Sequence, residues 1–446
     1  MTRRKTLVDV IIPAYRAEQT IVQTLESLIA QTDGRWRAWI MEDGLTDNTG
    51  NLANGMKDPR IICHALEKRG VSAARNAGFA FSDAPFVCFL DADDTIAPSY
   101  MERMISAARS SQCGASCGYS FINSAGDILQ QIPAAPTNAL STEALLRLDP
   151  PAIMSLLHRR DVLEKVAVNG ELFDTRLSMF EDWDLLKRIA QITSERWVQV
   201  PHVLANYHCT PGSASTKSIH RLLECGLKAI QSMPASPTIQ RASIRSHRVN
   251  CLAAAVVSGE PEIAREIAAD LIPLLSSDIG TLSTSISWHA MRRWGVTRVQ
   301  LEVRCQELVA NVQESFGETA QGRLLTRCID QIRDNPWHLA FEEAKRSLRN
   351  GGRIVLFGLG RNGLEAVQAA QELGIDCVTS DDDSHRFTPN MRSVRPDEIT
   401  KLDTVILTPL ESDPIAQRLN ANGIENLVRP QSLPVRHQIH STAGEP

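Results

Sequence analysis

The first half of the sequence predicts an α/β fold, in which helices cover a mostly parallel, open sheet. Two observations support this prediction. β-rich runs alternate with helical patterns such as residues 18–30, and the runs occupy residues 8–13, 36–41, 60–66 and 86–90. Strands separated by helices of that length imply right-handed crossovers. Because ligands bind beyond the carboxyl ends of the strands in such a sheet, the polar clusters after each strand are the expected place for chemistry.

The rest of the chain divides by pattern into further parts. Prolines over residues 131–151 indicate a connection or a flap, after which a helix to residue 192 and a strand over 197–207 complete a first domain of residues 1–215. Residues 216–347 are predicted to form a helical linker or oligomerisation region, with helices at 221–231, 239–258, 261–275, 297–315 and 337–349. A small Rossmann-like α/β domain is expected over residues 348–435, with strands at 353–357, 376–379 and 404–408. Residues 436–446 are expected to be a disordered tail.

Composition and charge exclude several classes of protein. The 446 residues are 43% hydrophobic and 22% charged, the balance of a globular protein. The net charge of −5, with scattered basic residues, gives no support to nucleic-acid binding. The sequence has no apolar run long enough to span a bilayer and no signal peptide, and the ten cysteines are typical of reduced thiols, so a cytoplasmic location is expected. The basic cluster at residues 3–5 could contact the inner face of a membrane or be only a solvated end.

Polar residues follow the first two predicted strands. Pro13 and Tyr15 end the first strand, where a turned backbone beside an aromatic ring suits a planar base. Taken alone, this site favours a simple strand stop. Asp43 precedes a glycine turn after the second strand, and its carboxylate could accept hydrogen bonds from a nucleobase or cap the following turn.

Charged residues follow the next two strands. Residues 70–78 start a helix rich in small side chains, and Arg75 is the charge best placed to meet a phosphate or a base carbonyl; a surface ion pair is the alternative. Asp91, Asp93 and Asp94 crowd the end of a buried strand, where their repulsion would be costly without a cation. Asp91 and Asp93 face the same side of an extended backbone. This arrangement suits Mn²⁺ or Mg²⁺ bridging the protein and a diphosphate.

Taken in order, four stretches resemble the family-two glycosyltransferases, inverting enzymes of the GT-A fold. The stretches are VDVIIPAY, WIMEDGLTDNT, GVSAARNAGFAFSDAPFVCFLDADD and FEDWDL. The resemblance covers residues 8 to about 215. It implies an enzyme that moves a sugar from a nucleotide-diphosphate sugar to a hydroxyl of a carbohydrate or glycolipid acceptor, in bacterial surface polysaccharide or glycoconjugate synthesis.

The resemblance also implies roles for individual residues. It assigns Asp43 to the nucleotide base. It assigns Asp91 and Asp93, with Ala92 between them, to the diphosphate and its metal, and Asp93 would be the direct metal ligand. It makes Asp182 the catalytic base.

Residues around this base extend the predicted site. Glu181 and Asp182 begin a helix, which puts the base at a cavity edge where it can take a proton from the acceptor; ordinary helix capping is the alternative. Trp183 could stack against a sugar face of the acceptor. His208 precedes the turn at residues 211–213, and is either a third metal ligand or a structural strand-end histidine.

A glycine motif lies in the C-terminal unit. Gly358, Gly360 and Gly363 fit a GxGxxG pattern between a strand and a helix, and Asp381 follows the next strand, where a ribose-binding carboxylate would sit. Dinucleotide binding is one interpretation, and close packing of helix on strand is the other. Because the unit lacks the second half of a dinucleotide site, bound NAD is not expected.

Two alternatives to an active glycosyltransferase stay open. One is a non-catalytic scaffold that binds nucleotide-sugars. The other is an NAD-linked oxidoreductase acting through the C-terminal domain, although the sequence has no evident hydride-site residues. The residues do not identify the sugar, nucleotide or acceptor, and a homo-oligomer formed through the helical region is an open expectation.

Overall fold

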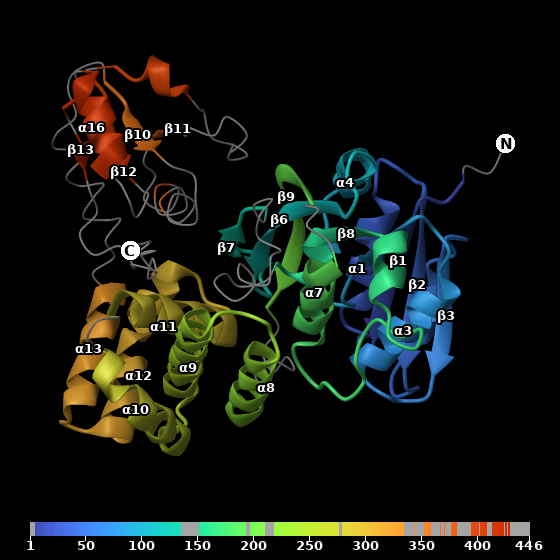
Figure 1. Ribbon diagram of the computed structural model, residues 1–446, viewed down its shortest axis with the longest axis horizontal. Coiled ribbons are helices and arrows are strands. Elements are labelled where there is room, and N and C mark those ends of the chain that lie inside the picture. The colour runs from blue at the N-terminus through green and yellow to red at the C-terminus, as the bar shows by residue number, and fades with distance from the viewer. Residues whose placement is uncertain are drawn as a thin grey trace, which may run out of the picture. The chain divides into compact units, whose positions relative to one another are not determined.

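The structure, a computed structural model, divides into two compact units, Met1–His247 and Arg248–Pro446 (Figure 1). It describes residues 5–134, 151–192, 197–209, 218–275, 279–333, 344, 352–357, 366, 370, 376–380, 394–400, 402–407, 413–422, 424–425 and 427–428. Most of the predicted flap, nearly all of the helix predicted at 337–349 and the predicted tail lie outside these residues. No helix in the described ranges combines the length and apolar character needed to cross a membrane.

The first unit contains the predicted parallel strands. β3, β2, β1 and β4 lie side by side in that order and run parallel to one another. Their bounds are Val8–Ala14 for β1, Trp36–Asp43 for β2, Ile61–Leu66 for β3 and Phe86–Phe89 for β4. The connecting helices are α1 Ile21–Ile29, α2 Thr49–Gly55 and α3 Val71–Phe81. The α/β fold class is therefore confirmed for this half of the chain.

The same sheet continues with strands that the sequence analysis did not predict. Beyond β4 the order is β8, β6, β9 and β5, with β7 paired to β6. The added strands are β5 Thr95–Ile96, β6 Gly114–Ile122, β7 Ile128–Ile132 and β8 Leu156–Arg159, and β9 Val198–His208 was predicted. The elements between them are α4 Tyr100–Arg109, η1 Ile153–Ser155, α6 Arg160–Val166 and α7 Glu181–Ile192. This half is mostly antiparallel, apart from β6 and β9, which run parallel.

Helix α3 lies unusually close to the sheet. A Cβ atom at Gly78 would come within 2.5 Å of Ile11 Cγ2 and 3.1 Å of Met41 Cγ, so only glycine fits between the helix and strands β1 and β2. Arg75 lies one turn earlier on the same helix face. It is 3% exposed, so its side chain is buried.

Helix α8, Ile219–Gln231, and the first part of α9, Pro237–Ser258, belong to the first unit. Lys187 of α7 donates a hydrogen bond to Ser232 at 3.2 Å, and the ring of Phe180 contacts His247. The contact boundary therefore falls after residue 247, whereas the sequence analysis placed a domain boundary after residue 215.

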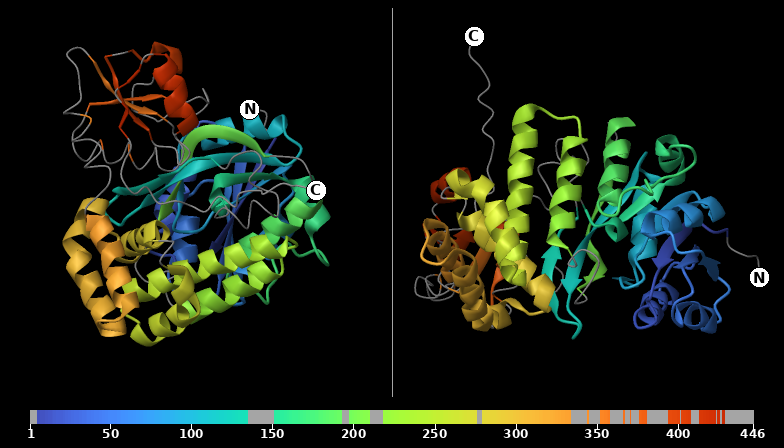
Figure 2. Two further views of the ribbon diagram at one scale, coloured as in Figure 1. Left: turned by 60° about the vertical axis from the view of Figure 1, so that its left-hand side comes forward. Right: turned by 90° about the horizontal axis from the view of Figure 1, so that it is seen from below.

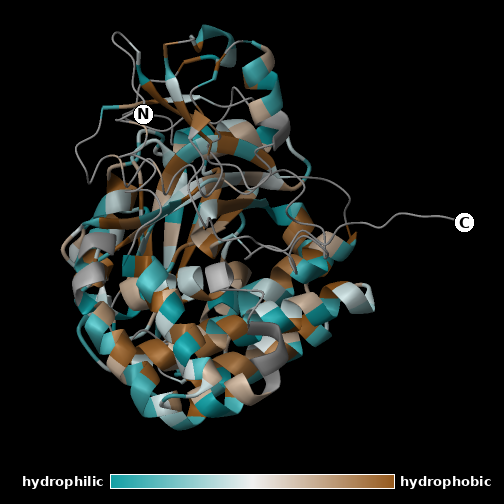
Figure 3. Cartoon of the chain, turned by 90° about the vertical axis from the view of Figure 1, so that its left-hand side faces the viewer, coloured by the Kyte–Doolittle hydropathy of each residue, from teal (hydrophilic) through white to brown (hydrophobic). Residues whose placement is uncertain are grey.

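The second unit begins with amphipathic helices. α12 packs against α10 and α13, and α11 packs against α13 (Figure 2). Figure 3 shows hydrophobic and hydrophilic residues alternating along the helices, as expected for elements that bury one face. The bounds are α10 Pro261–Leu275, α11 Ile279–Trp294, α12 Arg298–Phe316 and α13 Ala320–Arg333, of which α11 and α13 were not predicted.

A four-stranded parallel sheet follows in this unit. Its order is β11-β10-β12-β13. The elements are β10 Ile354–Phe357, β11 Val378–Ser380, η3 Pro396–Glu398, β12 Thr404–Leu407, α16 Asp413–Ala421 and β13 Leu427–Val428. Buried Val355, Phe357, Val405 and Leu407 form part of its core. Contacts group the helices and this sheet into one unit, and the predicted limits at residues 347 and 435 stay predictions.

Candidate active site

A single buried arginine joins three distant parts of the first unit. Arg75 of α3 donates from Nη2 to Asp91 Oδ1 and from Nη1 to Glu181 Oε1, each at 2.7 Å. Burial alone would lower the pKa of Arg75, but the charges of Asp91 and Glu181 outweigh it and raise that pKa above its usual range. The guanidinium is therefore charged at every working pH. It brings the end of β4 and the start of α7 to one site.

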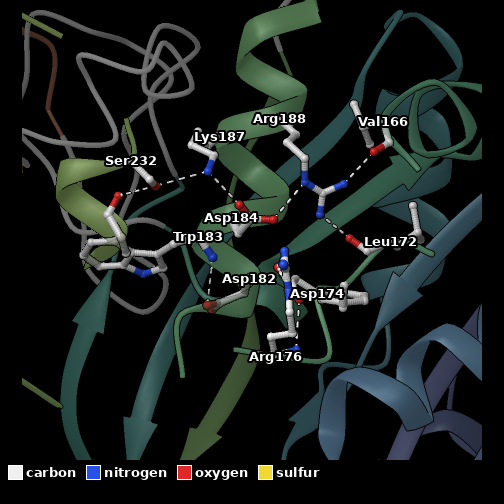
Figure 4. Close-up of polar contacts among 12 residues, drawn as sticks. Val166, Leu172, Asp174, Arg176, Asp182, Trp183, Asp184, Lys187, Arg188 and Ser232 are labelled. Carbon is white, nitrogen blue, oxygen red and sulfur yellow. Dashed lines mark hydrogen bonds and ion pairs between the residues drawn. The ribbon is translucent and has the colours of Figure 1, made fainter. Parts of the chain in front are cut away.

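Asp182 lies beside this ion-pair network. Its pKa is raised to about 7, first by burial and then by the charge of Glu181, while Arg75 acts in the opposite direction. The backbone N–H of Trp183 donates to Asp182 Oδ1 at 2.9 Å, as Figure 4 shows. A carboxylate with a pKa near neutrality can both accept and release a proton under working conditions, which is the property of a general base.

The start of α7 is anchored by a second set of polar contacts, which the sequence analysis missed. Asp184 pairs with Lys187 at 2.7 Å and with Arg188 at 2.8 Å. Arg188 also donates to the backbone carbonyls of Val166, at 2.6 Å, and Leu172 (Figure 4). These bonds tie α7 to the segment that precedes it, so they restrict how far Asp182 can move.

Asn76 fixes the other end of that segment onto α3. Its Oδ1 accepts from the backbone N–H groups of Leu172 at 3.0 Å and Phe173 at 2.8 Å, and its Nδ2 donates to the Phe173 carbonyl at 2.8 Å. The buried Phe173 ring packs edge-on against Phe89 with centroids 5.0 Å apart. A side chain adjacent to Arg75 thus holds the loop that leads to Glu181. The only sequence signal for it was its place beside Arg75 in the ARN stretch.

The predicted base-binding residues lie at the ends of β1 and β2. Asp43 is 4% exposed, and its carboxylate accepts from the backbone N–H groups of Arg69 at 2.7 Å and Gly70 at 3.0 Å. These bonds hold Gly70, whose φ of +94° favours glycine, at the entry to α3. Carboxylate oxygens keep further acceptor positions, so the bonds to the loop do not prevent a contact with a base.

Tyr15, the other predicted base-binding residue, is 39% exposed and follows Pro13 where β1 ends. Lys68 Nζ donates to the Tyr15 hydroxyl at 2.6 Å and lies 3.8 Å from the ring centroid. The hydrogen bond from Lys68 lowers the pKa of Tyr15 from its usual value. An exposed ring flanked by a cation offers a flat surface for a planar, electron-rich group.

The acidic cluster after β4 separates into two kinds of residue. Asp91 and Asp93 are partly exposed, whereas Asp94 is buried and accepts from the backbone N–H of His208 at 3.0 Å. The bond from His208 ties Asp94 to the end of β9. The carbonyl of Ala92 accepts from the Thr24 hydroxyl at 3.0 Å, which fixes the backbone between the two aspartates.

Asp91 and Asp93 offer the oxygen donors that Mg²⁺ and Mn²⁺ prefer, and two carboxylates completed by substrate phosphates are a common arrangement for such ions. These two residues therefore fit the expected cation. His208 is half-buried, burial lowers its pKa, and its Nε2 lies 3.1 Å from the Thr95 hydroxyl. Within the described ranges, no three His, Cys, Asp or Glu side chains cluster in a way that could hold a metal ion. The role of His208 as a third ligand stays a prediction.

The remaining predicted residues are those of the C-terminal glycine motif and Trp183. Gly358, Gly360, Gly363 and Asp381 of the C-terminal glycine motif lie outside the described residues. Trp183, expected to contact the acceptor, is half-buried in the first turn of α7, and its ring packs against Phe180 with centroids 4.9 Å apart.

Comparison with known proteins identifies the class of this domain. Residues 9–140 match the family described as Glycosyl transferase family 2. The family expected from the sequence motifs is therefore supported over residues 9–140 of the chain.

Individual relatives match over parts of the chain. The chain is 31% identical over 149 residues to the putative teichuronic acid biosynthesis glycosyltransferase TuaG of Bacillus subtilis, covering 32% of this chain and 59% of TuaG. It is 35% identical over 102 residues to the succinoglycan biosynthesis protein ExoO of Rhizobium meliloti, covering 23% and 29%. It is 38% identical over 89 residues to the UDP-Glc:alpha-D-GlcNAc-diphosphoundecaprenol beta-1,3-glucosyltransferase WfaP of Escherichia coli, covering 20% and 36%. The matched segments thus span less than two thirds of each relative.

Among solved structures, TarS 1-349 of S. aureus in complex with UDP-GlcNAc is similar to 76% of this chain and 92% of that chain. The sequence identity is 14% and the TM-score is 0.42.

Proposed function

We propose that this protein is an inverting glycosyltransferase that moves a sugar from a nucleotide-diphosphate sugar to an acceptor hydroxyl. One observation carries the proposal: Arg75 holds Asp91 and Glu181 at 2.7 Å each, so the aspartates after β4 and the Asp182 carboxylate share one site. A donor diphosphate and an acceptor hydroxyl need their respective carboxylates on either side of the transferred sugar, and this ion pair brings both sets together.

The residues of the chain account for the proton transfer. The acceptor oxygen forms a bond to the anomeric carbon while the bond from that carbon to the diphosphate oxygen breaks, and the electron pair leaves with the diphosphate. The acceptor proton passes to Asp182, whose pKa of about 7 allows it to accept a proton at neutral pH. Because a single displacement occurs from the opposite face, the anomeric centre inverts and no sugar becomes bonded to the enzyme.

Metal dependence is part of the proposal. Asp91 and Asp93 would hold Mn²⁺ or Mg²⁺, with Asp93 as the direct ligand, and the cation would neutralise charge on the departing diphosphate. The two carboxylates are partly exposed and supported by buried neighbours, Ala92 and Asp94, which keep their backbone fixed.

The donor and acceptor follow from the flanking residues and the relatives. Tyr15 and Asp43 would contact the nucleotide base, with Pro13 shaping the turn, and Trp183 would contact the acceptor. WfaP carries UDP-Glc in its name, so uridine diphosphate sugars are the first donors to test. The relatives named for succinoglycan and teichuronic acid make a role in bacterial surface polysaccharide synthesis the working proposal. All ten cysteines are free thiols, in keeping with a cytoplasmic location. We propose that the protein acts there at the inner face of the membrane.

The deciding experiment measures release of nucleoside diphosphate from a panel of nucleotide-sugars, with Mn²⁺, Mg²⁺ or a chelator. We expect turnover of one donor with a divalent cation, loss of about a hundredfold or more in D182N and D93N, and unchanged unfolding midpoints. Full activity in D182N would remove the proposed base. Nucleotide binding by calorimetry without turnover of any donor would favour the scaffold alternative. The matched relatives support neither that alternative nor an NAD-linked oxidoreductase.

A further inference from the structure

We infer that helix α8 and the first part of α9 position the catalytic helix, acting through a contact between His247 and Phe180. The inference rests on the proposed function of Asp182. It assigns a role to residues that lie beyond the family match at 9–140, in a region where the sequence analysis found no catalytic residues.

Phe180 has an unusual backbone conformation immediately before the catalytic residues. Its φ is +64°, in the left-handed region that a bulky residue rarely adopts. Its carbonyl accepts the backbone N–H of Asp184 at 3.1 Å, so this conformation sets where the first turn of α7 begins. Strained backbone of this kind persists only where the surroundings hold it in place. What holds Phe180 therefore also places Glu181 and Asp182.

Two aromatic rings hold the Phe180 side chain. Its ring packs edge-on against Trp183, with centroids 4.9 Å apart and planes at 73°. On the other side it packs edge-on against the His247 ring, with centroids 5.9 Å apart and planes at 79°. Of these two rings, Trp183 belongs to the same turn of helix, and His247 comes from outside the catalytic segment.

His247 is itself fixed against α8. The residue is 8% exposed, and its Nε2 lies 3.1 Å from the Leu222 carbonyl and 3.3 Å from the Leu223 carbonyl. The ring fits there because residue 226 is glycine: a Cβ atom at Gly226 would clash with both Cε1 and Nε2 of the imidazole. The glycine of α8, which carries no strained φ, is therefore explained by the space that His247 occupies.

Two further contacts join α8 to the same segment. Ser178, two residues before Phe180, has its Oγ 3.8 Å from Sγ of Cys225 in α8. Lys187 of α7 donates a hydrogen bond of 3.2 Å to Ser232, at the end of α8. Together with the His247 ring, α8 and α9 therefore contact the catalytic segment before, at and after Phe180. Contacts on both sides of the strained residue are what a role in positioning this turn requires.

The test is a pair of substitutions that move the ring without touching the site. G226A adds a methyl group inside a helix, where alanine is otherwise favourable, and displaces the imidazole. H247A removes the ring. We expect both to lower kcat for donor turnover by on the order of tenfold or more, with donor KM within about twofold, because a small misplacement of a base affects the chemical step rather than donor binding. G226A/H247A should match H247A alone, since the clash disappears with the ring. K228A, on the exposed face of α8, is the matched control and should keep the wild-type kcat.

A second measurement does not depend on activity. Amide hydrogen exchange over residues 178–184 should become faster in G226A and H247A, while exchange in β1 and β2 stays as in the wild type. Unchanged exchange over 178–184, or wild-type kcat in both variants, would overturn the inference. If the wild type turns over no donor at all, the proposed function fails, and the exchange comparison still decides whether His247 orders this turn.

Discussion

Substituting Glu181 by glutamine should move the pH dependence of the reaction in a defined direction. Glu181 raises the pKa of Asp182 and is the second cause of that rise after burial. E181Q removes this negative charge while keeping the size of the side chain. The pKa of Asp182 should therefore fall below its present value of about 7, and the ascending limb of the pH profile should move to lower pH.

The size of the shift follows from electrostatics. Neighbouring carboxylates at a helix start lie roughly 7 Å apart, and at an effective dielectric constant near 20 their repulsion is about 2 kcal/mol. That energy corresponds to between about one and two pKa units. Arg75 adds to the effect, because the guanidinium that pairs with Glu181 at 2.7 Å would keep its charge beside Asp182. We therefore expect the limb to move by at least about one pH unit.

The assay is kcat/KM for donor turnover between about pH 5 and pH 9, because this range covers both the protonated and the ionised form of Asp182. This ratio reports groups of the free enzyme, to which the structure corresponds. E224Q is the matched control, because Glu224 lies on the exposed face of α8 in a pair with Lys228 and should leave the profile unchanged. A limb that stays in place, or moves to higher pH, in E181Q would refute Asp182 as the titrating base.

Three further predictions test the network and the core. R75M should move the same limb to higher pH, because the charge of Arg75 lowers the pKa of Asp182, and the pH profile of kcat/KM measures it. D9N should lower the free energy of unfolding by about 3 kcal/mol in urea titrations, since the fully buried Asp9 carboxylate accepts from Arg37, Trp39 and two backbone N–H groups. Burial lowers the pKa of His158 from 6.5 to about 4, so the unfolded state takes up the proton first and stability falls as pH drops through that window. In H158F, the free energy of unfolding should therefore fall by about 3 kcal/mol less than in the wild type between pH 6.5 and about 4, as measured by urea titrations at both pH values.

The parallel half of the sheet could be predicted from the sequence because each strand is an apolar run followed by a helical pattern. The antiparallel half could not. β6 reads GASCGYSFI, in which glycine, serine and cysteine hide an otherwise buried strand, and β5 has only two residues. These strands exist because they pair with neighbours far along the chain, and tertiary pairing overrides local propensity.

The candidate site shows the same division. Motif spacing predicted that Asp91 and Asp93 follow a buried strand and that Asp182 begins a helix, and the structure places them after β4 and in the first turn of α7. Residues 91–94 form a turn, however, and not the extended backbone that was expected. The link between them could not be predicted, because Arg75 and Glu181 are separated by 106 positions and either could pair elsewhere. The role of Asn76 was hidden for the same reason, since its partners are backbone groups 96 and 97 positions away. The strained φ of Phe180 also has no signal in a sequence.

The balance of charge around Arg75 connects the raised pKa of Asp182 with the proposed divalent cation. Asp91, Glu181 and Asp182 surround one guanidinium, and the raised pKa of Asp182 is the direct consequence of burial among like charges. A nucleoside diphosphate approaching the same residues brings further negative charge, which Arg75 alone cannot offset while it pairs with two carboxylates. This is the physical reason for placing a divalent cation at Asp91 and Asp93 in the proposed mechanism. It also means that donor binding and the charge state of Asp182 must be coupled, since each negative charge added near the base raises its pKa and each cation lowers it.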